Sequence, residues 1–440
     1  MINQFGTSMI TAIISLLLSS SYHEARAKDY PATTYRIRQE ESLIANRNNR
    51  NAIIYTKLCV LKTKQKNYQE AIKACDKAIT IDSNYQYAYV SRGDAKAGKD
   101  DHKGAIDDYS KAVEIFPKYY YALAMRGDSK AELEDYEGAI EDYGKALEID
   151  PKYHYAFAMR GDSKAELEDY KGAIDDYSKA VEIDPKYYYA LAMRGDSKYR
   201  LEDYKGAIDD YSKAVEIYPK YHYAFAMRGD SKYRLEDYKG AIKDYSISIR
   251  IEPIYTYAII QRGYANDKLE NHEDAINDYS KAIILNTNSA DPYFSRCRAK
   301  YKLGNYAAAE IDCNAAIELD KGNYRAYWMR GMIRVELAKY NVSINDFDIV
   351  ISNQDSEELG GAPMAYLYAY RGWAKYYEAD YKGAIDDFSK AIKIEPNNST
   401  FYDARGDAKS KNGDQYGSID DYNKAIEIES SKKDYGTVKT

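Results

Sequence analysis

Apolar and small residues return along most of this chain with one fixed spacing. Within Tyr120 to Tyr153 they predict two helical segments, separated by the polar stretch Glu134 to Tyr136. The second segment ends before Pro151, because proline cannot continue a helix. The first segment carries two stripes at helical spacing, so one stripe packs on the second helix and the other faces away from it. The pattern therefore predicts a helical hairpin.

This hairpin unit repeats every 34 residues. An arginine followed by glycine or cysteine marks each copy: Arg92, Arg126, Arg160, Arg194, Arg228, Arg262, Arg296 and Arg330, then Arg371 and Arg405. The interval from 330 to 371 is 41 residues, so one insertion of seven residues interrupts the series near Ser352 to Pro363. Counting back from Arg92 gives a divergent first unit around Leu58. Eleven repeats are predicted, from about Ala52 to Glu429.

Numbering the unit from 1 at Tyr120 to 34 at Tyr153 gives small residues at 8, 20 and 27, an aromatic at 24 and proline at 32. This pattern resembles the tetratricopeptide repeat family. Three positions depart from that family's usual residues, with Leu123, Arg126 and Lys130 in place of tryptophan, leucine and tyrosine. The resemblance implies an all-α fold, a right-handed superhelical α-solenoid of helix-turn-helix repeats, in which stacked hairpins share one continuous core.

The rest of the chain divides around these repeats. Residues 1–27 are predicted to be a signal peptide, since the apolar run Met9 to Leu18 precedes an Ala-Arg-Ala sequence at 25–27. The alternatives are an uncleaved membrane anchor and a cytosolic N-terminus. Residues 28–51 lead into repeats 1–9 at 52–351, an inserted loop follows at 352–364, repeats 10 and 11 span 365–429, and 430–440 is a polar tail. Export to the periplasm, an organelle lumen or the outside is expected.

Charge and motifs exclude several functions. The net charge of −7 opposes binding to nucleic acid, which requires a basic surface. The five histidines are scattered without metal-ligand spacing, and no phosphate-binding glycine loop, nucleophile elbow or zinc-protease helix occurs. We therefore expect no enzyme activity, no metal and no cofactor.

Two positions change together along the series. Position 7 is arginine and position 23 is aspartate in repeats 2 to 11, whereas repeat 1 has Leu58 and Ala74. This joint loss favours an ion pair inside each hairpin, such as Arg160 with Asp176 and Arg194 with Asp210, over pairing between neighbouring repeats. Shared ancestry without contact is the alternative. A buried pair of this kind sets register more than stability.

The resemblance also implies a binding site. In tetratricopeptide repeat proteins, positions 2, 5, 9, 12, 13 and 34 line a concave groove that holds extended peptides or partner helices. By position, the groove residues here are Tyr87, Tyr121, Tyr155, Tyr189, Tyr223 and Tyr257 at 2, with Asp94, Asp128, Asp162, Asp196 and Asp230 at 9. Later repeats place Lys268, Arg298, Lys302 and Arg325 on the same stripe. We expect tyrosine-to-alanine changes there to weaken binding with little effect on folding, as groove residues outside the core.

The expected partner is a protein or peptide, with a basic or an aromatic and proline-rich segment. A saccharide stacked on a tyrosine ladder is the alternative, and a membrane would be bound only if the N-terminal segment is uncleaved. The polar tail cannot cap the last repeat, so self-association through that end is possible. The near-identical repeats between Lys118 and Pro253 indicate either a repetitive ligand or a recent duplication.

The four cysteines fall at equivalent positions. Cys59 and Cys75 occupy positions 8 and 24 of repeat 1, and Cys297 and Cys313 occupy them in repeat 8. In a hairpin that turns near position 16, these positions face each other across helix axes ~8 to 10 Å apart, leaving roughly 3.5 to 5.5 Å between Cα atoms. That range overlaps the ~4.4 to 6.8 Å of a disulfide. Two bridges are predicted, with a volume-conserving replacement of glycine and tyrosine as the alternative.

Overall fold

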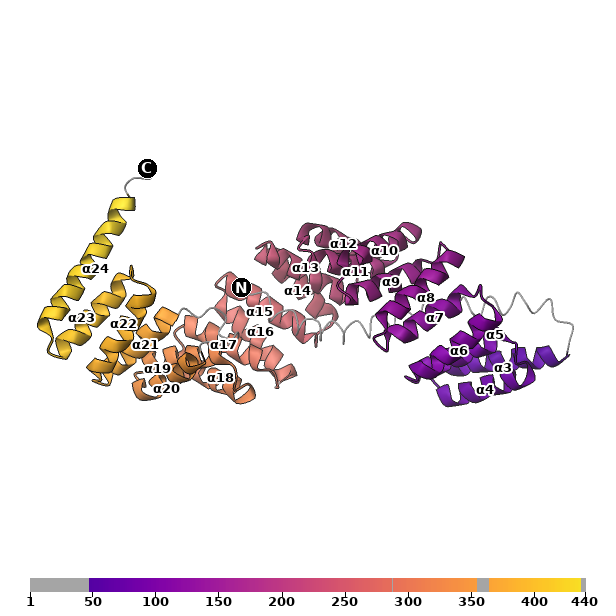
Figure 1. Ribbon diagram of the computed structural model, residues 1–440, viewed down its shortest axis with the longest axis horizontal. Helices are drawn as coiled ribbons and strands as arrows, with labels where there is room; N and C mark the ends of the chain where they lie inside the picture. The colour runs from indigo at the N-terminus through magenta and orange to yellow at the C-terminus, as the bar shows by residue number, and fades with distance from the viewer. Residues whose placement is uncertain (1–46, 287, 354–363, 437–440) are drawn as a thin grey trace. The chain divides into compact units, whose positions relative to one another are not determined.

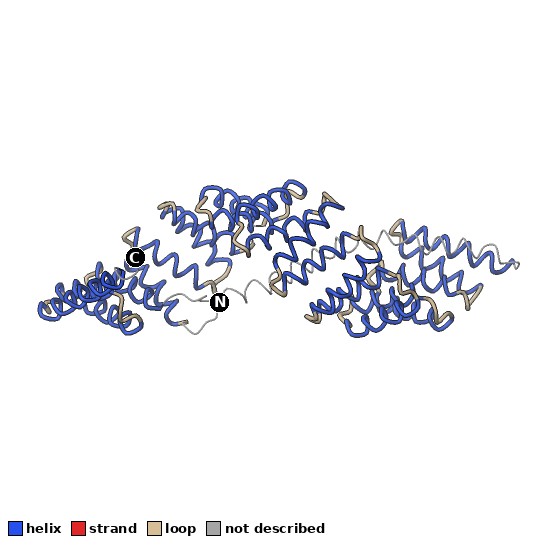
Figure 2. Tube along the Cα trace, turned by 90° about the horizontal axis from the view of Figure 1, so that it is seen from above, coloured by secondary structure: helices blue, strands red, loops and turns tan. Residues whose placement is uncertain are grey.

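The computed structural model describes residues 47–286, 288–353 and 364–436. These residues form helices joined by short turns, and consecutive helices pair as hairpins (Figures 1 and 2). They divide into an N-terminal unit that ends at Ile251 and a C-terminal unit that begins at Glu252. The signal segment, its cleavage site and residues 354–363 of the inserted loop lie outside the described residues.

The N-terminal unit contains repeats 1 to 6, and each repeat has a first helix (helix A) and a second helix (helix B). The helices, in A and B order, are α3 (Arg47–Lys64), α4 (Tyr68–Ile81), α5 (Gln86–Ala97), α6 (His102–Ile115), α7 (Tyr120–Ala131), α8 (Tyr136–Ile149), α9 (His154–Glu166), α10 (Tyr170–Ile183), α11 (Tyr188–Arg200), α12 (Tyr204–Ile217), α13 (His222–Arg234) and α14 (Tyr238–Ile251).

The C-terminal unit contains repeats 7 to 11 in the same order. Its helices are α15 (Thr256–Lys268), α16 (His272–Leu285), α17 (Ala290–Lys302), α18 (Tyr306–Leu319), α19 (Tyr324–Glu336), α20 (Tyr340–Ser352), α21 (Met364–Tyr377), α22 (Tyr381–Ile394), α23 (Ser399–Lys411) and α24 (Gln415–Gly436). The described residues therefore have the helix-hairpin repeat architecture of an all-α solenoid.

Two consecutive residues, at positions 15 and 16, form the turn between helices A and B. Glu134 at position 15 adopts a left-handed conformation with φ of 62°. The next residue, Asp135, caps helix B by accepting a hydrogen bond from the backbone N–H of Gly138 at 3.0 Å. The cap satisfies a donor that the helix leaves unpaired, and it recurs in most repeats of the N-terminal unit.

Outside repeats 1 and 8, close packing inside the hairpin depends on glycine at position 8. A Cβ added to Gly161 would lie 2.7 Å from Cε1 of the Tyr177 ring. The ring at position 24 thus lies directly against the backbone of helix A. Ala139 and Ala146, at positions 20 and 27, are completely buried and let the neighbouring helices approach.

The described ends differ from the inner repeats. Helix α24 continues to Gly436, and Ile426 on it is 64 % exposed, although the equivalent Ile392 of repeat 10 is 8 % exposed. Self-association through this end stays a prediction. No helix in the described ranges combines the length and apolar character needed to cross a bilayer.

Candidate functional site

An ion pair joins the two helices of each repeat from 2 to 11. Arginine Nη2 at position 7 lies 2.6 to 2.7 Å from aspartate Oδ1 at position 23 in the same repeat. Arg160 with Asp176 and Arg194 with Asp210 are both paired in this way. The guanidinium also donates through Nε, as from Arg160 to Asp176 at 2.8 Å, so the contact is bidentate.

A second cation contacts the same aspartate. Lys164 at position 11 lies 2.8 Å from Asp176 Oδ2, the oxygen that also accepts from Arg160 Nε. Arginine at 7 and lysine at 11 replace leucine and tyrosine of the related family. These replacements belong together, because one buried carboxylate needs both cations or equivalent hydrogen bonds.

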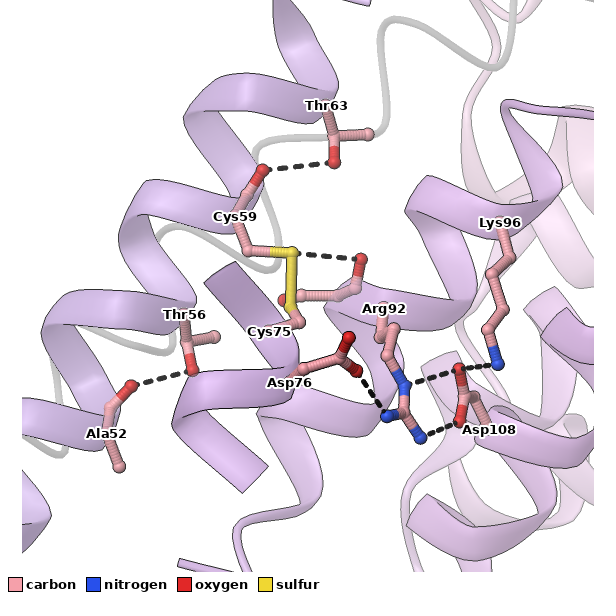
Figure 3. Close-up of a disulfide and its surroundings, with 10 residues drawn as sticks. Ala52, Thr56, Cys59, Thr63, Cys75, Asp76, Arg92, Lys96 and Asp108 are labelled. Carbon is pink, nitrogen blue, oxygen red and sulfur yellow. Dashed lines mark hydrogen bonds and ion pairs between the residues drawn. A yellow bond between two sulfur atoms is a disulfide. The ribbon is translucent and has the colours of Figure 1, made fainter. Parts of the chain in front are cut away.

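The arginine also reaches back to the preceding repeat. Arg92 Nη1 lies 2.7 Å from Asp76 of repeat 1, and Arg126 Nη1 donates to Ser110 of repeat 2 at 3.2 Å. In Figure 3, Arg92 lies between Asp76 and Asp108, with Lys96 on the far side of Asp108. The arginine therefore pairs within its own hairpin and also bonds to the preceding hairpin. Only the pairing within the hairpin was predicted from the sequence.

Both cysteine pairs form disulfides. Cys59 and Cys75, shown in Figure 3, have Cα atoms 5.5 Å apart. Cys297 and Cys313 have the same Cα separation, and no described cysteine is free. Each bridge occupies the place of the glycine and aromatic ring found in the other repeats. The bridge links helix A to helix B at the place where, in the other repeats, the aromatic ring at position 24 packs against helix A.

The tyrosines and aspartates expected in the groove contact one another. Asp162 accepts hydrogen bonds from Tyr177 of its own repeat at 2.7 Å and from Tyr189 of the next repeat at 2.8 Å. The same pair of donors recurs around Asp128 and Asp196. The bond from Tyr177 joins helix B to helix A within one repeat, whereas the bond from Tyr189 joins helix A of one repeat to helix A of the next. The bonds between A helices run along a stripe that we call the A face (positions 2, 5, 9, 12 and 13).

Burial corrects one expectation about this set. Tyr155, Tyr189 and Tyr223 are 1 %, 2 % and 4 % exposed, and Asp128 is completely buried. Tyr87, Tyr121, Asp94 and Asp230 are buried as well, whereas Asp162, Asp196 and Tyr257 are partly exposed. The interpretation that these tyrosines lie outside the core was wrong, because their rings fill the contact between neighbouring A helices. Their role in binding stays a prediction.

Burial also changes the ionisation of the ladder carboxylates. It raises the pKa of Asp162 to about 7, although the hydrogen bonds from Tyr177 and Tyr189 act in the opposite direction. The pKa of Asp196 rises to about 6 for the same reason. The pKa of Asp421 is instead lowered, because the hydrogen bonds from Arg405 and Lys409 outweigh its burial.

Between repeats 7 and 8, in the C-terminal unit, the bond between neighbouring A helices recurs with its two residues exchanged. Tyr264 at position 9 bonds to Asp291 at position 2 of the next repeat, so tyrosine and aspartate have traded places. Asp267 at position 12 accepts from Tyr279 at 3.0 Å and from Arg298 at 3.1 Å. Arg298, which the sequence analysis placed on the groove, thus completes this network.

Positions 12 and 13 belong to the predicted groove, but their residues in repeats 3 to 6 were not named as site residues. Glu132, directly after α7, and Glu166, at the end of α9, are exposed. Tyr199 and Arg234 lie on α11 and α13. Arg234 Nε donates to the Tyr199 hydroxyl at 3.1 Å, and its guanidinium lies 6.0 Å over the ring. A comparison of the near-identical repeats with one another would have revealed these residues.

Parts of the chain match models of a known protein family. Models of the tetratricopeptide repeat match residues 52–85, 90–154, 124–188, 158–222 and 192–253. No curated protein matches the chain significantly.

Solved structures provide further similarity. A tetratricopeptide repeat protein from Parabacteroides merdae is 21 % identical, covering 58 % of this chain and 98 % of its own, with a TM-score of 0.42. YrrB, described as having an unusual peptide-binding site, is 22 % identical over 43 % of this chain and 97 % of its own, with a TM-score of 0.37. MamA is 24 % identical over 37 % of this chain and 94 % of its own, with a TM-score of 0.35.

Proposed function

We propose, since the chain belongs to the tetratricopeptide repeat family, that it is a non-enzymatic scaffold that binds an extended or helical segment of another protein along its A face. Repeats of this family are typically protein-interaction scaffolds. YrrB, of similar fold, is described as binding a peptide. The proposal goes further by placing the partner on the A face.

The observation that carries the proposal is the hydrogen-bonded ladder of repeats 3 to 6. Asp128, Asp162 and Asp196 each join two tyrosines, and so fix successive A helices to one another. A surface fixed before binding loses little conformational entropy when the partner arrives. The tyrosines and aspartates of the predicted groove then serve as its floor, and the exposed and partly exposed side chains at positions 12 and 13 contact the partner.

The chemistry of the partner follows from the charges on this floor. Glu132 and Glu166 are exposed beside the partly exposed Asp162. This acidic end favours a basic segment, while Tyr199 adds an aromatic surface suited to proline or aromatic side chains. The two disulfides support export, because such bonds persist in oxidising compartments.

A saccharide remains the second candidate, with an observation of its own. In repeats 9 and 10, Tyr377 is 55 % exposed and stacks on Tyr340 at 4.8 Å and on Trp373 at 6.1 Å between ring centroids. Exposed stacked rings are suited to a sugar face. Binding of polysaccharide would be insensitive to salt, whereas a basic segment on the acidic end would be released by it.

Site-specific photo-crosslinking in cells that express the full chain tests the proposal. A benzophenone amino acid at Ala165, position 12 of α9, is expected to give discrete adducts with another protein. The control places it at Lys179 on α10, helix B of the same repeat, whose side chain is 59 % exposed. Equal adducts at both positions, or none at Ala165, would contradict the A face as the binding surface.

A further inference from the structure

Repeats 3 to 6 are nearly identical in helix A, but they differ as two pairs at positions 12 and 13. Repeats 3 and 4 have Ala-Glu there, ending in Glu132 and Glu166, whereas repeats 5 and 6 have Tyr-Arg, ending in Arg200 and Arg234. The other differences in helix A, at positions 1 and 4, alternate from one repeat to the next. The change from alanine to tyrosine at position 12 and the charge reversal at position 13 are therefore the two changes that separate the first pair of A helices from the second.

These residues lie on the A face beside the ladder. Electrostatic interactions link Glu166 to Asp162, Arg200 to Asp196 and Arg234 to Asp230, so these three charged side chains are near the aspartates at position 9 of their own repeats. Arg234 crosses to Tyr199 on the preceding A helix. Tyr199 in turn packs on Tyr204 at 5.3 Å between ring centroids, which fixes its position.

Three of these four charged side chains, Glu132, Glu166 and Arg234, are exposed, and Arg200 is partly exposed. Arg200 acts electrostatically on Glu166 of the preceding repeat, and Arg234 donates to the Tyr199 hydroxyl. Acidic residues of the turn, such as Glu168 and Glu202, occur at the same position in all four repeats. They add the same negative charge to each of the four repeats, so they cannot cause the charge reversal between the two pairs.

The length of the stripe sets the length of the partner segment. Neighbouring A helices are bonded through the ladder, and packed helices lie roughly 8 to 10 Å apart. Four helices then span roughly 24 to 30 Å, which an extended chain crosses in about eight residues at ~3.3 Å each.

We propose that the A face of repeats 3 to 6 recognises a partner segment of about eight residues with a basic half followed by an acidic half, or the reverse order. The basic half lies over Glu132 and Glu166, and the acidic half over Arg200 and Arg234. A uniformly basic segment meets repulsion at the second half, so the reversal selects against it. This inference rests on the proposed function and names the chemistry of its partner.

Two synthetic peptides of equal composition test the inference on the full-length protein. One has a run of lysines followed by an equal run of glutamates, and the other alternates the two residues. Both have blocked termini and a fluorescent label for anisotropy at low salt. The block peptide is expected to bind about five- to tenfold more tightly than the alternating peptide, a difference of about 1.0 to 1.4 kcal/mol.

Variants made from the chain's own repeats provide the controls. Replacing Tyr199→Ala, Arg200→Glu, Tyr233→Ala and Arg234→Glu makes the stripe uniformly acidic, and it should abolish the preference for the block peptide. Adding Ala131→Tyr, Glu132→Arg, Ala165→Tyr and Glu166→Arg to those four changes restores two opposite halves in swapped order, and it should restore the preference. Both variants use residues that sister repeats already accommodate, and thermal melting checks their folding.

The outcomes separate the two proposals. Equal affinity of the wild type for both peptides, absence of measurable binding, or a preference that survives in the uniformly acidic variant would each overturn the charge inference. Adducts at Ala165 in the crosslinking experiment would then still support the proposed function. Loss of those adducts, with or without a peptide preference, would count against the proposed function itself.

Discussion

At the scale of single residues, the aspartate at position 23 organises each hairpin. Asp176 is 4 % exposed and contacts Arg160 and Lys164, which are themselves only about a fifth exposed. Two cations around one buried carboxylate compensate its desolvation, whereas removal of the carboxylate leaves them close together without a partner.

Asp176→Ala should therefore destabilise the protein by about 3 to 5 kcal/mol, towards the lower figure because Arg160 retains some solvent. Thermal melting or chemical denaturation measures the change. Asp175→Ala, at the exposed neighbouring position, is the matched control and should change stability by less than about 0.5 kcal/mol. A double-mutant cycle of Asp176→Ala with Arg160→Met that shows no coupling would contradict the ion pair.

The ladder carboxylates predict a second, pH-dependent effect. Asp162 has a folded pKa of about 7 and Asp196 of about 6, both above the ~3.9 of an unfolded aspartate. Between those values the folded protein binds more protons than the unfolded chain. Their contribution to stability is thus complete below about pH 4 and lost as pH rises through 6 to 7.

The variant Asp162→Asn/Asp196→Asn removes both titrations. Its melting temperature relative to the wild type should increase from pH 4 to pH 8, because only the wild type loses stability through these groups. Melting curves across this range, with Asp175→Asn as the control that shows no such trend, measure it. A difference that is constant with pH would contradict the raised pKa values.

At the scale of the helices, the glycines separate close packing from helix propensity. Gly161 and Gly144 both lie inside helices, but a Cβ meets the Tyr177 ring at 2.7 Å in the first case and only Arg160 Nη1 at 3.9 Å in the second. Alanine is a better helix former than glycine at both positions. Whether a change from glycine to alanine stabilises or destabilises the protein at these two positions therefore depends on the packing around the new methyl group.

Gly161→Ala should destabilise the protein by about 1 to 3 kcal/mol through overpacking, although it improves helix propensity. Gly144→Ala should stabilise by about 0.5 to 1 kcal/mol, since there is room for its methyl group. Denaturation of the two variants beside the wild type measures both. If the two changes had the same sign, the close approach of α9 to the Tyr177 ring would be refuted.

At the scale of the whole molecule, each repeat contacts mainly its neighbours, so a local change remains local. The two disulfides lie in repeat 1 and repeat 8, in different units, and each closes a loop of a size that stabilises by about 3 kcal/mol. Their loss should affect the surrounding repeats and leave the middle of the N-terminal unit unchanged.

Reduction should accelerate amide hydrogen exchange in α3 to α6 and in α15 to α20, with little change in α9 to α12. Mass spectrometry of peptide fragments before and after reduction measures this, and thiol counting without reductant should find no free cysteine. Free thiols in the untreated protein would contradict the bridges. A uniform rise of exchange along the chain would contradict independent behaviour of the repeats.

The sequence by itself determined the period, the hairpins, the pairing of positions 7 and 23, and the facing of Cys59 and Cys75. Each follows from spacing along two antiparallel helices, because helical geometry fixes which positions face each other. The tyrosines at position 2 were placed correctly on the stripe for the same reason. What spacing cannot give is the depth at which a side chain lies.

Only the tertiary structure decided that Tyr155 and Tyr189 are buried and bonded to the aspartates, because this depends on how closely one hairpin stacks on the next. The hydrogen bond from Arg126 to Ser110 of the preceding repeat could not be predicted from the sequence for the same reason. Contacts between hairpins join residues far apart in sequence, and the tilt and separation of the helices determine them. The repeat pattern fixes which residues meet within a hairpin, whereas stacking decides which residues remain for a partner.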